Sequence, residues 1–266
     1  MRLGATVRLE SWQVDLELPP QWRGVSKLLY TFREDYEPEL ALLDRLLPPG
    51  GVFIDCGASI GIYSLVASRV VGAQGCVISF EPGSAAAEAL EHNLKLNGIE
   101  NVRLFHAAAS DRCGRTLLRH ESDPGRNSLV SAMTTPKAPG CSRPLASTSS
   151  HLEEIEATSL DDTLEACALT RLDMIKMDVE GAEELVLRGA DRTIQRFWPH
   201  VIFEVNPKAA GRLGLDADGA WNFLSARGYE FCRMTPGGTV SRIDAMPGGA
   251  NVVAIHPRRE CASILS

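Results

Sequence analysis

Short apolar runs alternate with longer amphipathic stretches along most of this chain. Seven runs have the length and composition of buried strands, at residues 52–56, 76–81, 102–107, 172–177, 201–205, 229–234 and 251–255. Amphipathic spacing between them predicts helices at residues 39–47, 63–70, 84–96, 159–167, 182–189 and 217–227. This alternation indicates an α/β fold with a doubly wound, seven-stranded sheet. The last strand is expected to be antiparallel, because the connection before it is too short for a helical crossover.

The segments outside this alternation have their own patterns. Apolar and polar residues alternate between Val7 and Leu18, which predicts a short β-hairpin, and residues 28–36 are less regular. Residues 122–150 are rich in Pro, Gly, Ser and Thr, so we expect a long mobile loop whose residues 126–129 can reach the pocket. Residues 156–158 have the pattern of a short edge strand.

A chain of 266 residues can bury one large core. We therefore expect an N-terminal extension of edge strands and a helix at residues 1–48, which covers the cofactor or substrate. One domain is expected at residues 49–258, followed by a C-terminal tail at residues 259–266.

A turn rich in glycine follows the first predicted strand. Gly57 and Gly61 lack a Cβ atom, so a ligand and the next helix can lie close to the main chain. Glu81 ends the second predicted strand, where a carboxylate can accept hydrogen bonds from ribose hydroxyls. Asp55 opens the turn, and its carboxylate would repel a pyrophosphate but attract an ammonium or sulfonium group. The turn therefore favours S-adenosylmethionine over NAD.

Further motifs accompany this turn in a fixed order, over roughly residues 36–255. They are Asp55-Cys-Gly57-Ala-Ser-Ile-Gly61-Ile-Tyr63-Ser-Leu, Glu81-Pro82, Asn93-Leu-Lys-Leu-Asn97, Ser159-Leu-Asp-Asp162, Ile175-Lys-Met-Asp178-Val-Glu180-Gly-Ala-Glu183 and Phe203-Glu204-Val-Asn206. Together they resemble the motifs of FkbM-type S-adenosylmethionine-dependent methyltransferases. The resemblance implies a Rossmann-like class I methyltransferase fold with S-adenosylmethionine as cofactor. Ser59 departs from the family, which usually has Asn at this position.

Cofactor contacts are expected from the glycine turn, from the ends of neighbouring strands and, by resemblance, from the segment before the first strand. The predicted set is Tyr36, Asp55, Gly57, Ala58, Ser59, Gly61, Tyr63, Glu81, Ser110, Asp111 and Asp178. By resemblance, Ser110 and Asp111 would meet the adenine amine. Two of these residues have alternative interpretations, because Tyr36 can be a surface aromatic over a helix end and Ser110 can belong to a turn.

Three carboxylates are candidates for catalysis. An acceptor hydroxyl is a poor nucleophile until its proton is removed, so a carboxylate at the carboxyl edge of the sheet can serve as general base. Asp178 and Glu180 follow the fourth predicted strand, and Glu204 lies at the end of the fifth. Structural alternatives exist for each: Asp178 as a helix N-cap, Glu180 as a first-turn acid, and Glu204 as a partner of Lys176.

The same acidic residues and Asn206 form an oxygen-rich set that Mg²⁺ would accept. No His is interleaved with them at a recognisable spacing, so we favour a site without metal.

Composition narrows the range of partners. A net charge of −7 gives no electrostatic footprint for nucleic acid. No apolar stretch is long enough to span a bilayer, and the N-terminal residues lack the apolar core of a signal peptide. The seven cysteines are scattered without a close pair, which favours reduced thiols and a cytoplasmic location. The sequence does not indicate an oligomeric state.

The function expected from these observations is methylation of a hydroxyl group on a small molecule or saccharide, and the oxygen acceptor comes from the family resemblance. Two alternatives stay open at this point. An NAD-dependent oxidoreductase shares the acidic residue after the second strand, and a non-catalytic module would bind the cofactor without turnover.

Overall fold

The computed structural model describes residues 4–19, 24–120, 127–130, 152–235 and 238–259. Most of the predicted loop at 122–150 and most of the predicted tail therefore lie outside the described residues. Within these ranges, none of the helices is long and apolar enough to cross a membrane.

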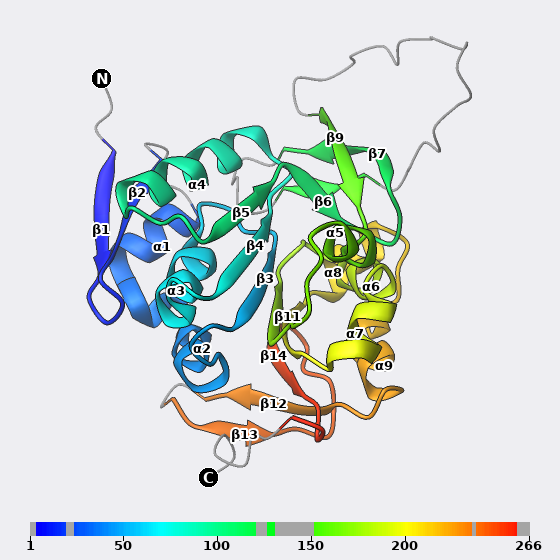
Figure 1. The fold of residues 1–266 in the computed structure, drawn as a ribbon. Coiled ribbons are helices and arrows are strands. Elements are labelled where there is room, and N and C mark those ends of the chain that lie inside the picture. Colours follow the sequence, from blue (N-terminus) through cyan, green and yellow to red (C-terminus); the bar gives the residue numbers. More distant parts are fainter. Residues whose placement is uncertain (1–3, 20–23, 121–126, 131–151, 236–237, 260–266) are drawn as a thin grey trace.

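The main sheet has eight strands (Figure 1). Their order is β13 (Val240–Arg242), β12 (Glu230–Met234), β14 (Ala250–Ile255), β11 (His200–Val205), β10 (Met174–Met177), β3 (Val52–Cys56), β4 (Cys76–Phe80) and β5 (Val102–Phe105). The five strands from β11 to β5 are parallel, whereas β14 runs antiparallel to both of its neighbours. The doubly wound sheet and its antiparallel last strand are confirmed, and β13 adds an eighth strand at one edge.

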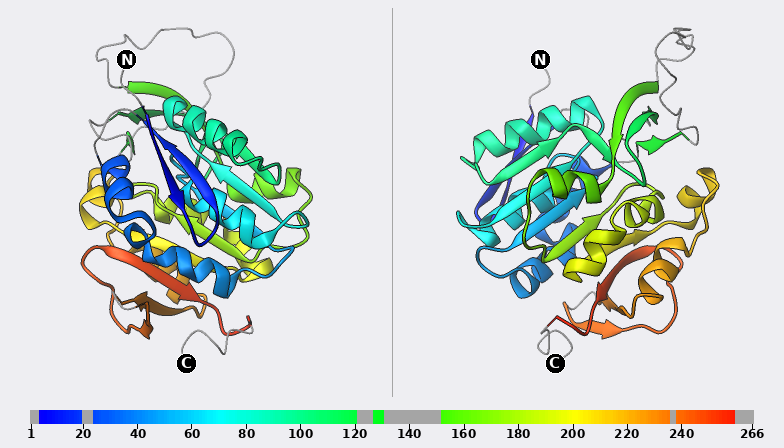
Figure 2. Two further views of the ribbon diagram at one scale, coloured as in Figure 1. Left: turned by 90° about the vertical axis from the view of Figure 1, so that its left-hand side faces the viewer. Right: turned by 45° about the vertical axis from the view of Figure 1, so that its right-hand side comes forward.

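Helices cover both faces of this sheet (Figures 1 and 2). One face packs against α2 (Ala41–Leu46), α3 (Ile62–Val71) and α4 (Ser84–Leu96). The other face packs against α5 (Leu160–Ala166), α6 (Glu183–Arg188), α7 (Asp191–Phe197) and α9 (Gly219–Ser225). Because the sheet is buried on both faces, its central strands read as continuous apolar runs. The pattern missed α7 and α8 (Pro207–Arg212).

The N-terminal segment shares the core of the domain. The predicted hairpin is present as β1 (Ala5–Leu9) and β2 (Val14–Leu18). Its inward residues Val7 and Leu16 are fully buried in one cluster with Phe53 of β3. Residues 28–36, which the pattern left irregular, lie in α1 (Val25–Phe32) and the 3-10 helix η1 (Arg33–Tyr36). A second 3-10 helix, η2 (Pro38–Leu40), precedes α2 where one helix was predicted from residue 39.

Asn93 of α4 and Asn97, which directly follows this helix, fasten the hairpin to the domain. Asn93 accepts a hydrogen bond from the Glu17 main-chain N–H at 2.8 Å and donates one to the Ile60 carbonyl at 3.0 Å. Asn97 makes a similar pair of bonds with the main chain of Asp15. These side chains therefore satisfy main-chain groups on the free edge of β2, which would otherwise be left unpaired next to the helix.

A second sheet of four strands stands beside the carboxyl end of the first (Figure 1). Its order is β6 (Ala107–Ala109), β9 (Leu152–Thr158), β7 (Gly114–Arg119) and β8 (Ser128–Leu129). The predicted strand at 102–107 was wrong in extent, because the chain leaves the main sheet after β5 and β6 then pairs with β9. The strand expected at 156–158 is the end of β9, but its assignment as an edge strand was wrong, because β9 pairs with β6 on one side and β7 on the other.

A serine lies at the start of two of the predicted helices, α4 and α5. Ser159 caps α5, with its hydroxyl accepting from the Asp162 N–H at 3.1 Å. Ser84 does not cap α4, because the helix already includes Ser84 and its hydroxyl bonds Glu153 instead.

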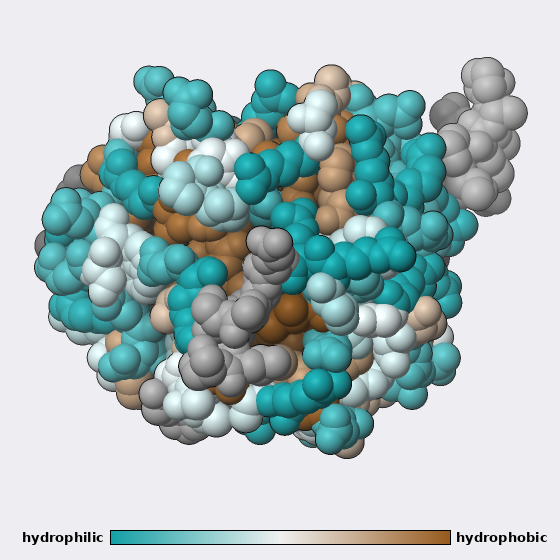
Figure 3. Space-filling model, turned by 60° about the horizontal axis from the view of Figure 1, so that its bottom comes forward, coloured by the Kyte–Doolittle hydropathy of each residue, from teal (hydrophilic) through white to brown (hydrophobic). Residues whose placement is uncertain are grey.

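On the surface of the molecule, the side that carries β12 and β13 shows mainly hydrophilic residues, with hydrophobic ones in recesses between them (Figure 3).

We predict that Asn93→Ala lowers the free energy of unfolding by about 2–4 kcal/mol, because it removes a buried side chain and leaves the Glu17 N–H and the buried Ile60 carbonyl without these partners. Urea denaturation measures this change. Lys95→Ala, at an exposed position of the same helix, is the control and should change stability by less than about 0.5 kcal/mol. Equal effects of the two substitutions would contradict the assigned role of Asn93.

Candidate functional site

The turn between β3 and α3 lies against the turn that follows β10. Gly57 has φ +80°, and a Cβ atom added there would lie 2.0 Å from the main-chain oxygen of Asp178. Only glycine allows this approach. Gly61 has φ +98°, and a Cβ atom there would lie 2.2 Å from Leu90 of α4. The two predicted glycines thus bring two strand ends together and let α3 pack beside α4.

Glu81 is held at the end of β4 by main-chain donors. Its carboxylate accepts hydrogen bonds from the N–H groups of Ser59 and Gly83, both at 2.8 Å. Burial raises the pKa of Glu81 to about 7, although these two hydrogen bonds lower it. Ser59 has φ +50°, a conformation in which Asn is enriched over most other residues, so this Ser adopts the left-handed geometry without the residue usual in the family.

A pocket opens between these turns and the second sheet. Its lining residues are Gly57, Ser59, Glu81, Pro82, Ala108, Ala109, Leu118, Asn127, Leu129, Asp178, Val179 and Glu180. The apolar residues lie mainly on the second sheet, and the carboxylates lie at the strand ends of the main sheet. The arrangement offers an apolar wall at one side and acceptors for hydroxyl or cationic groups at the other.

The pocket contains some of the predicted cofactor residues. Gly57, Ser59, Glu81 and Asp178 line it, as does the predicted catalytic residue Glu180. The lining does not include the other members of the predicted set, which are Tyr36, Asp55, Ala58, Gly61, Tyr63, Ser110 and Asp111. Ala108 and Ala109 line the pocket one step earlier in the chain than the predicted Ser110, whose N–H donates to the Thr158 carbonyl at 2.9 Å.

Asp55 lies below the pocket, in the interior. The Ser64 hydroxyl donates to its carboxylate at 2.5 Å and also contacts the Ser79 hydroxyl at 2.7 Å. Burial raises the pKa of Asp55 to about 6, whereas the bond from Ser64 lowers it. From this position the Asp55 carboxylate acts on the site through its charge and through its hydrogen bond with Ser64 of α3.

A second group of polar residues lies on the other side of Asp178. Lys176 is buried on β10, with Nζ 3.6 Å from Asp178 Oδ2 and 5.1 Å from the centre of the Tyr63 ring. Burial by itself would lower the pKa of Lys176, but nearby carboxylates raise it above its ordinary value. These carboxylates belong to Asp178, Glu37, Asp55 and Glu204.

Glu37 completes this group from the N-terminal segment. Its carboxylate accepts from the Tyr63 hydroxyl at 3.1 Å and from the Asn251 amide at 3.4 Å. Burial raises the pKa of Glu37 to about 7. The sequence reading missed Glu37 as a site residue, although it lies next to the predicted Tyr36.

The turn after β10 is shaped by a residue that the sequence reading did not single out. Glu183 is buried, and its carboxylate accepts from the N–H groups of Val179 at 3.1 Å and Gly181 at 3.4 Å. Burial raises the pKa of Glu183 to about 7. Glu180 within this turn has φ +54°, a strained conformation of the kind that gathers at functional sites.

The structural alternatives for the three catalytic candidates can now be compared with the contacts. The N-cap interpretation of Asp178 was wrong, because Ala182 precedes the first residue of α6. The ion pair of Lys176 is with Asp178. The carboxylate of Glu204 is one of four that raise the pKa of Lys176. The Glu204 carboxylate accepts from the Asn206 amide at 3.3 Å. Among the described residues, no three His, Cys, Asp or Glu side chains are arranged to hold a metal ion.

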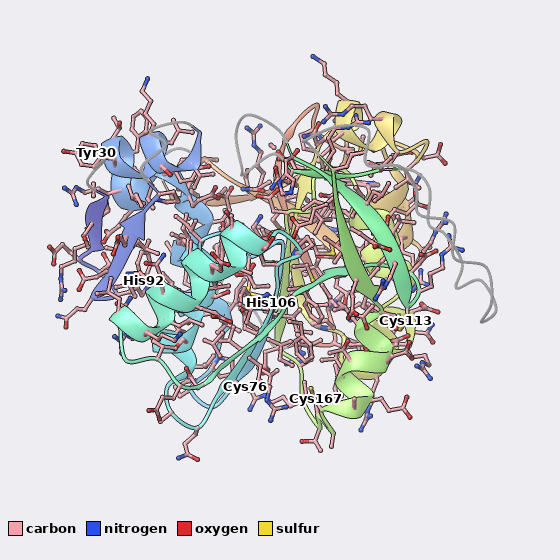
Figure 4. All side chains as sticks on the ribbon, turned by 90° about the horizontal axis from the view of Figure 1, so that it is seen from above. Tyr30, Cys76, His92, His106, Cys113 and Cys167 are labelled. Carbon is pink, nitrogen blue, oxygen red and sulfur yellow. The ribbon has the colours of Figure 1, made fainter. Side chains whose placement is uncertain are left out.

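The carboxyl edge of the main sheet is flanked on two sides. Figure 4 views the molecule from above, with α1 and its labelled Tyr30 at one side and the second sheet near Cys113 at the other. The contacts agree with this picture, because Glu37 approaches from the N-terminal side and Leu118 from the second sheet.

Comparison with known proteins identifies one family. Residues 55–231 match the model of the methyltransferase FkbM domain. The chain is 28% identical over 253 residues to the AMB antimetabolite synthetase AmbE of Pseudomonas aeruginosa, covering 83% of this chain and 12% of AmbE. It is 29% identical over 131 residues to the 2-O-methyltransferase NoeI of Sinorhizobium fredii, covering 44% of this chain and 48% of NoeI. It thus spans less than half of either relative.

A solved structure of a methyltransferase FkbM from Methylobacillus flagellatus superimposes with a TM-score of 0.47. Its sequence identity to this chain is 16%, and the match covers 86% of this chain and 53% of that one.

We predict that Asp55→Asn changes how stability depends on pH. A carboxyl group whose pKa is raised on folding from 3.8 to about 6 destabilises the folded state as pH rises through that interval. The amide of the variant would lack this ionisation but could still accept from Ser64. The free energy of unfolding of the variant, relative to the native chain, should therefore rise by about 2 kcal/mol between pH 4 and pH 7.5.

Chemical denaturation across this pH range measures the difference. Asp216→Asn, at an exposed position, serves as the control and should give a difference that is constant with pH. A constant difference for Asp55→Asn would show that Asp55 ionises as it does in the unfolded chain.

Proposed function

This chain belongs to the FkbM methyltransferase family, and from that membership we propose that it methylates a hydroxyl group on a small molecule or a sugar. It is an S-adenosylmethionine-dependent methyltransferase. The family therefore selects methyl transfer over the oxidoreductase and the non-catalytic module that the glycine turn alone left open. The acceptor and the roles of individual residues are the proposal.

The lining of the pocket fits S-adenosylmethionine chemically. The Glu81 carboxylate would accept hydrogen bonds from the ribose hydroxyls, and Ala108, Ala109 and Leu118 would pack against the adenine. Asp178 and Glu180 place negative charge at the other side of the lining, where the cationic part of the cofactor would be favoured. When bound, the cofactor supplies an electrophilic methyl group on a sulfonium.

The position of Asp178 carries the proposal for the acceptor. Asp178 lines the cofactor pocket and at the same time contacts Lys176 in the neighbouring polar group. Hydrogen-bonding side chains thus extend from the cofactor pocket to the polar group around Lys176, where an acceptor hydroxyl could bind. We propose that Asp178, Glu180 and Glu204 bind and orient this acceptor, and that one of the carboxylates at this edge takes its proton.

Two further points support an oxygen acceptor and a cover over the site. NoeI is named a 2-O-methyltransferase, and it is similar to this chain over 131 residues. The described part of residues 1–48 shares the core of the domain and brings Glu37 to the site. We therefore propose that residues 1–48 form a cover over a domain at 49–258. A cytoplasmic location stays a prediction from the cysteine pattern.

Glu81→Gln should weaken binding of S-adenosylhomocysteine by about 10–100-fold, because a charged acceptor for two ribose hydroxyls is replaced by a neutral amide. Isothermal titration calorimetry measures the affinity. Glu88→Gln, an exposed carboxylate on α4, should leave it within about twofold. If Glu81→Gln binds S-adenosylhomocysteine as tightly as the native chain does, Glu81 does not bind the ribose hydroxyls.

A methyl-acceptor screen tests the function itself. The chain is incubated with methyl-labelled S-adenosylmethionine and a panel of glycosides, polyketide-like alcohols and peptides, and mass spectrometry locates the label. We expect methylation on oxygen, and we expect Asp178→Asn to lower the rate about 100-fold or more. Glu165→Gln, exposed on α5, should keep the native rate. Labelling of amines alone would refute the hydroxyl acceptor.

A further inference from the structure

Glu37 reaches the active site from a part of the chain that precedes the whole sheet. It lies between η1 and η2, and its carboxylate contacts Tyr63 at the start of α3 and Asn251 on β14. Tyr63 and Asn251 both donate to the Oε2 atom of Glu37, so two elements distant in the chain hold this oxygen in place. Such fixation at an active-site edge is typical of a group with a positional role.

Lys176 is the second observation, and it is independent of Glu37. Its side chain is 2% exposed, and Nζ makes no hydrogen bond within the ranges that the structure describes. Its contacts are the ion pair with Asp178 and the face of the Tyr63 ring. A buried ammonium group has three donors to satisfy, so an incomplete set indicates that another oxygen is received there.

The two residues share a neighbour, and this places them relative to the cofactor pocket. The Tyr63 hydroxyl contacts Glu37 while the Tyr63 ring lies beneath the Lys176 ammonium. Lys176 in turn contacts Asp178, which lines the pocket. A hydroxyl oxygen beside Lys176 would therefore lie near the Glu37 carboxylate. The methyl donor, in the pocket that Asp178 lines, would lie on the other side of Asp178.

We propose that Glu37 is the general base that takes the proton from the acceptor hydroxyl, and that Lys176 holds the acceptor oxygen. This inference rests on the proposed O-methylation and names its base. The hydroxyl proton passes to the Glu37 carboxylate, and the oxygen lone pair forms the new bond to the methyl carbon. The carbon–sulfur bond breaks, and its electron pair stays on sulfur, which becomes the neutral thioether of S-adenosylhomocysteine. Glu37 then returns the proton to water.

The surroundings of Glu37 suit this role better than those of Asp178 and Glu204. Asp178 is 43% exposed at its side chain and faces the Lys176 ammonium, and Glu204 accepts from Asn206. Glu37 is desolvated, which raises its pKa to about 7. The charged and titratable groups that act on it are Lys176 and the Tyr63 hydroxyl, which lower its pKa, and Asp178 and Glu39, which raise it. A base with this pKa takes up protons efficiently near neutral pH.

The test compares Glu37→Gln with Tyr63→Phe and with Glu34→Gln, a control carboxylate on η1 that accepts from Ser11. The native chain and the variants are assayed between pH 5.5 and 9 with the alcohol of the panel that the native chain methylates fastest. Calorimetry with S-adenosylhomocysteine measures cofactor affinity in parallel. The native rate should rise with pH through about 7, as Glu37 ionises.

For Glu37→Gln we expect a loss of about 100-fold or more in kcat and the disappearance of this rise, with cofactor affinity within about threefold. Tyr63→Phe should move the rise to higher pH, because the hydroxyl no longer stabilises the carboxylate. Glu34→Gln should match the native profile. A residue with only a structural role would not alter the position of the pH profile in this way.

Three outcomes would overturn the inference. If Glu37→Gln keeps the rate and the rise, or if Asp178→Asn alone removes the rise, the base is another residue. If Glu37→Gln loses cofactor affinity, Glu37 binds the cofactor instead of the acceptor. If the native chain binds cofactor but methylates no alcohol, the proposed function itself fails, and the role of Glu37 fails with it.

Discussion

Burial of charge at one edge of the main sheet is the constraint on which this site depends. Glu37, Glu81 and Glu183 have raised pKa values because the fold removes them from water, and Asp55 beneath them is affected in the same way. Each accepts hydrogen bonds from donors whose positions the fold fixes. Desolvated carboxylates oppose folding at neutral pH, so their presence is explained better by function than by stability.

The order of the strands explains where this charge gathers. Strand β3 has β4 on one side and β10 on the other, so the chain changes direction across the sheet at β3. A crevice forms at such a switch point, outside the carboxyl ends of the strands. The close approach of Gly57 to the main chain of Asp178 narrows this crevice at its base. The second sheet then supplies an apolar wall, and the N-terminal segment supplies Glu37, so the two sides of the crevice differ in chemistry.

Local patterns in the sequence were sufficient for much of this arrangement. The apolar runs located seven of the eight strands of the main sheet, and the glycine turn with Glu81 located part of the pocket lining, because these signals depend on residues close together in the chain. The residues that the pattern missed are distant from the turn. Glu37 and Asn251 are separated by 214 positions, and Leu118 belongs to a sheet whose existence the pattern did not predict. Asp55 was expected at the cofactor, yet Ser64 of the following helix α3 donates a hydrogen bond to it in the interior.

By itself, the sequence determined the doubly wound fold, the family and the class of cofactor, because periodicity and short motifs record the conformation of the nearby chain. Only the tertiary structure decided which carboxylates share one space, how far each is removed from water and which of them faces Lys176. Those properties arise from packing between elements that are far apart in the chain. Charge, burial and distance act through space, and a linear pattern does not contain them.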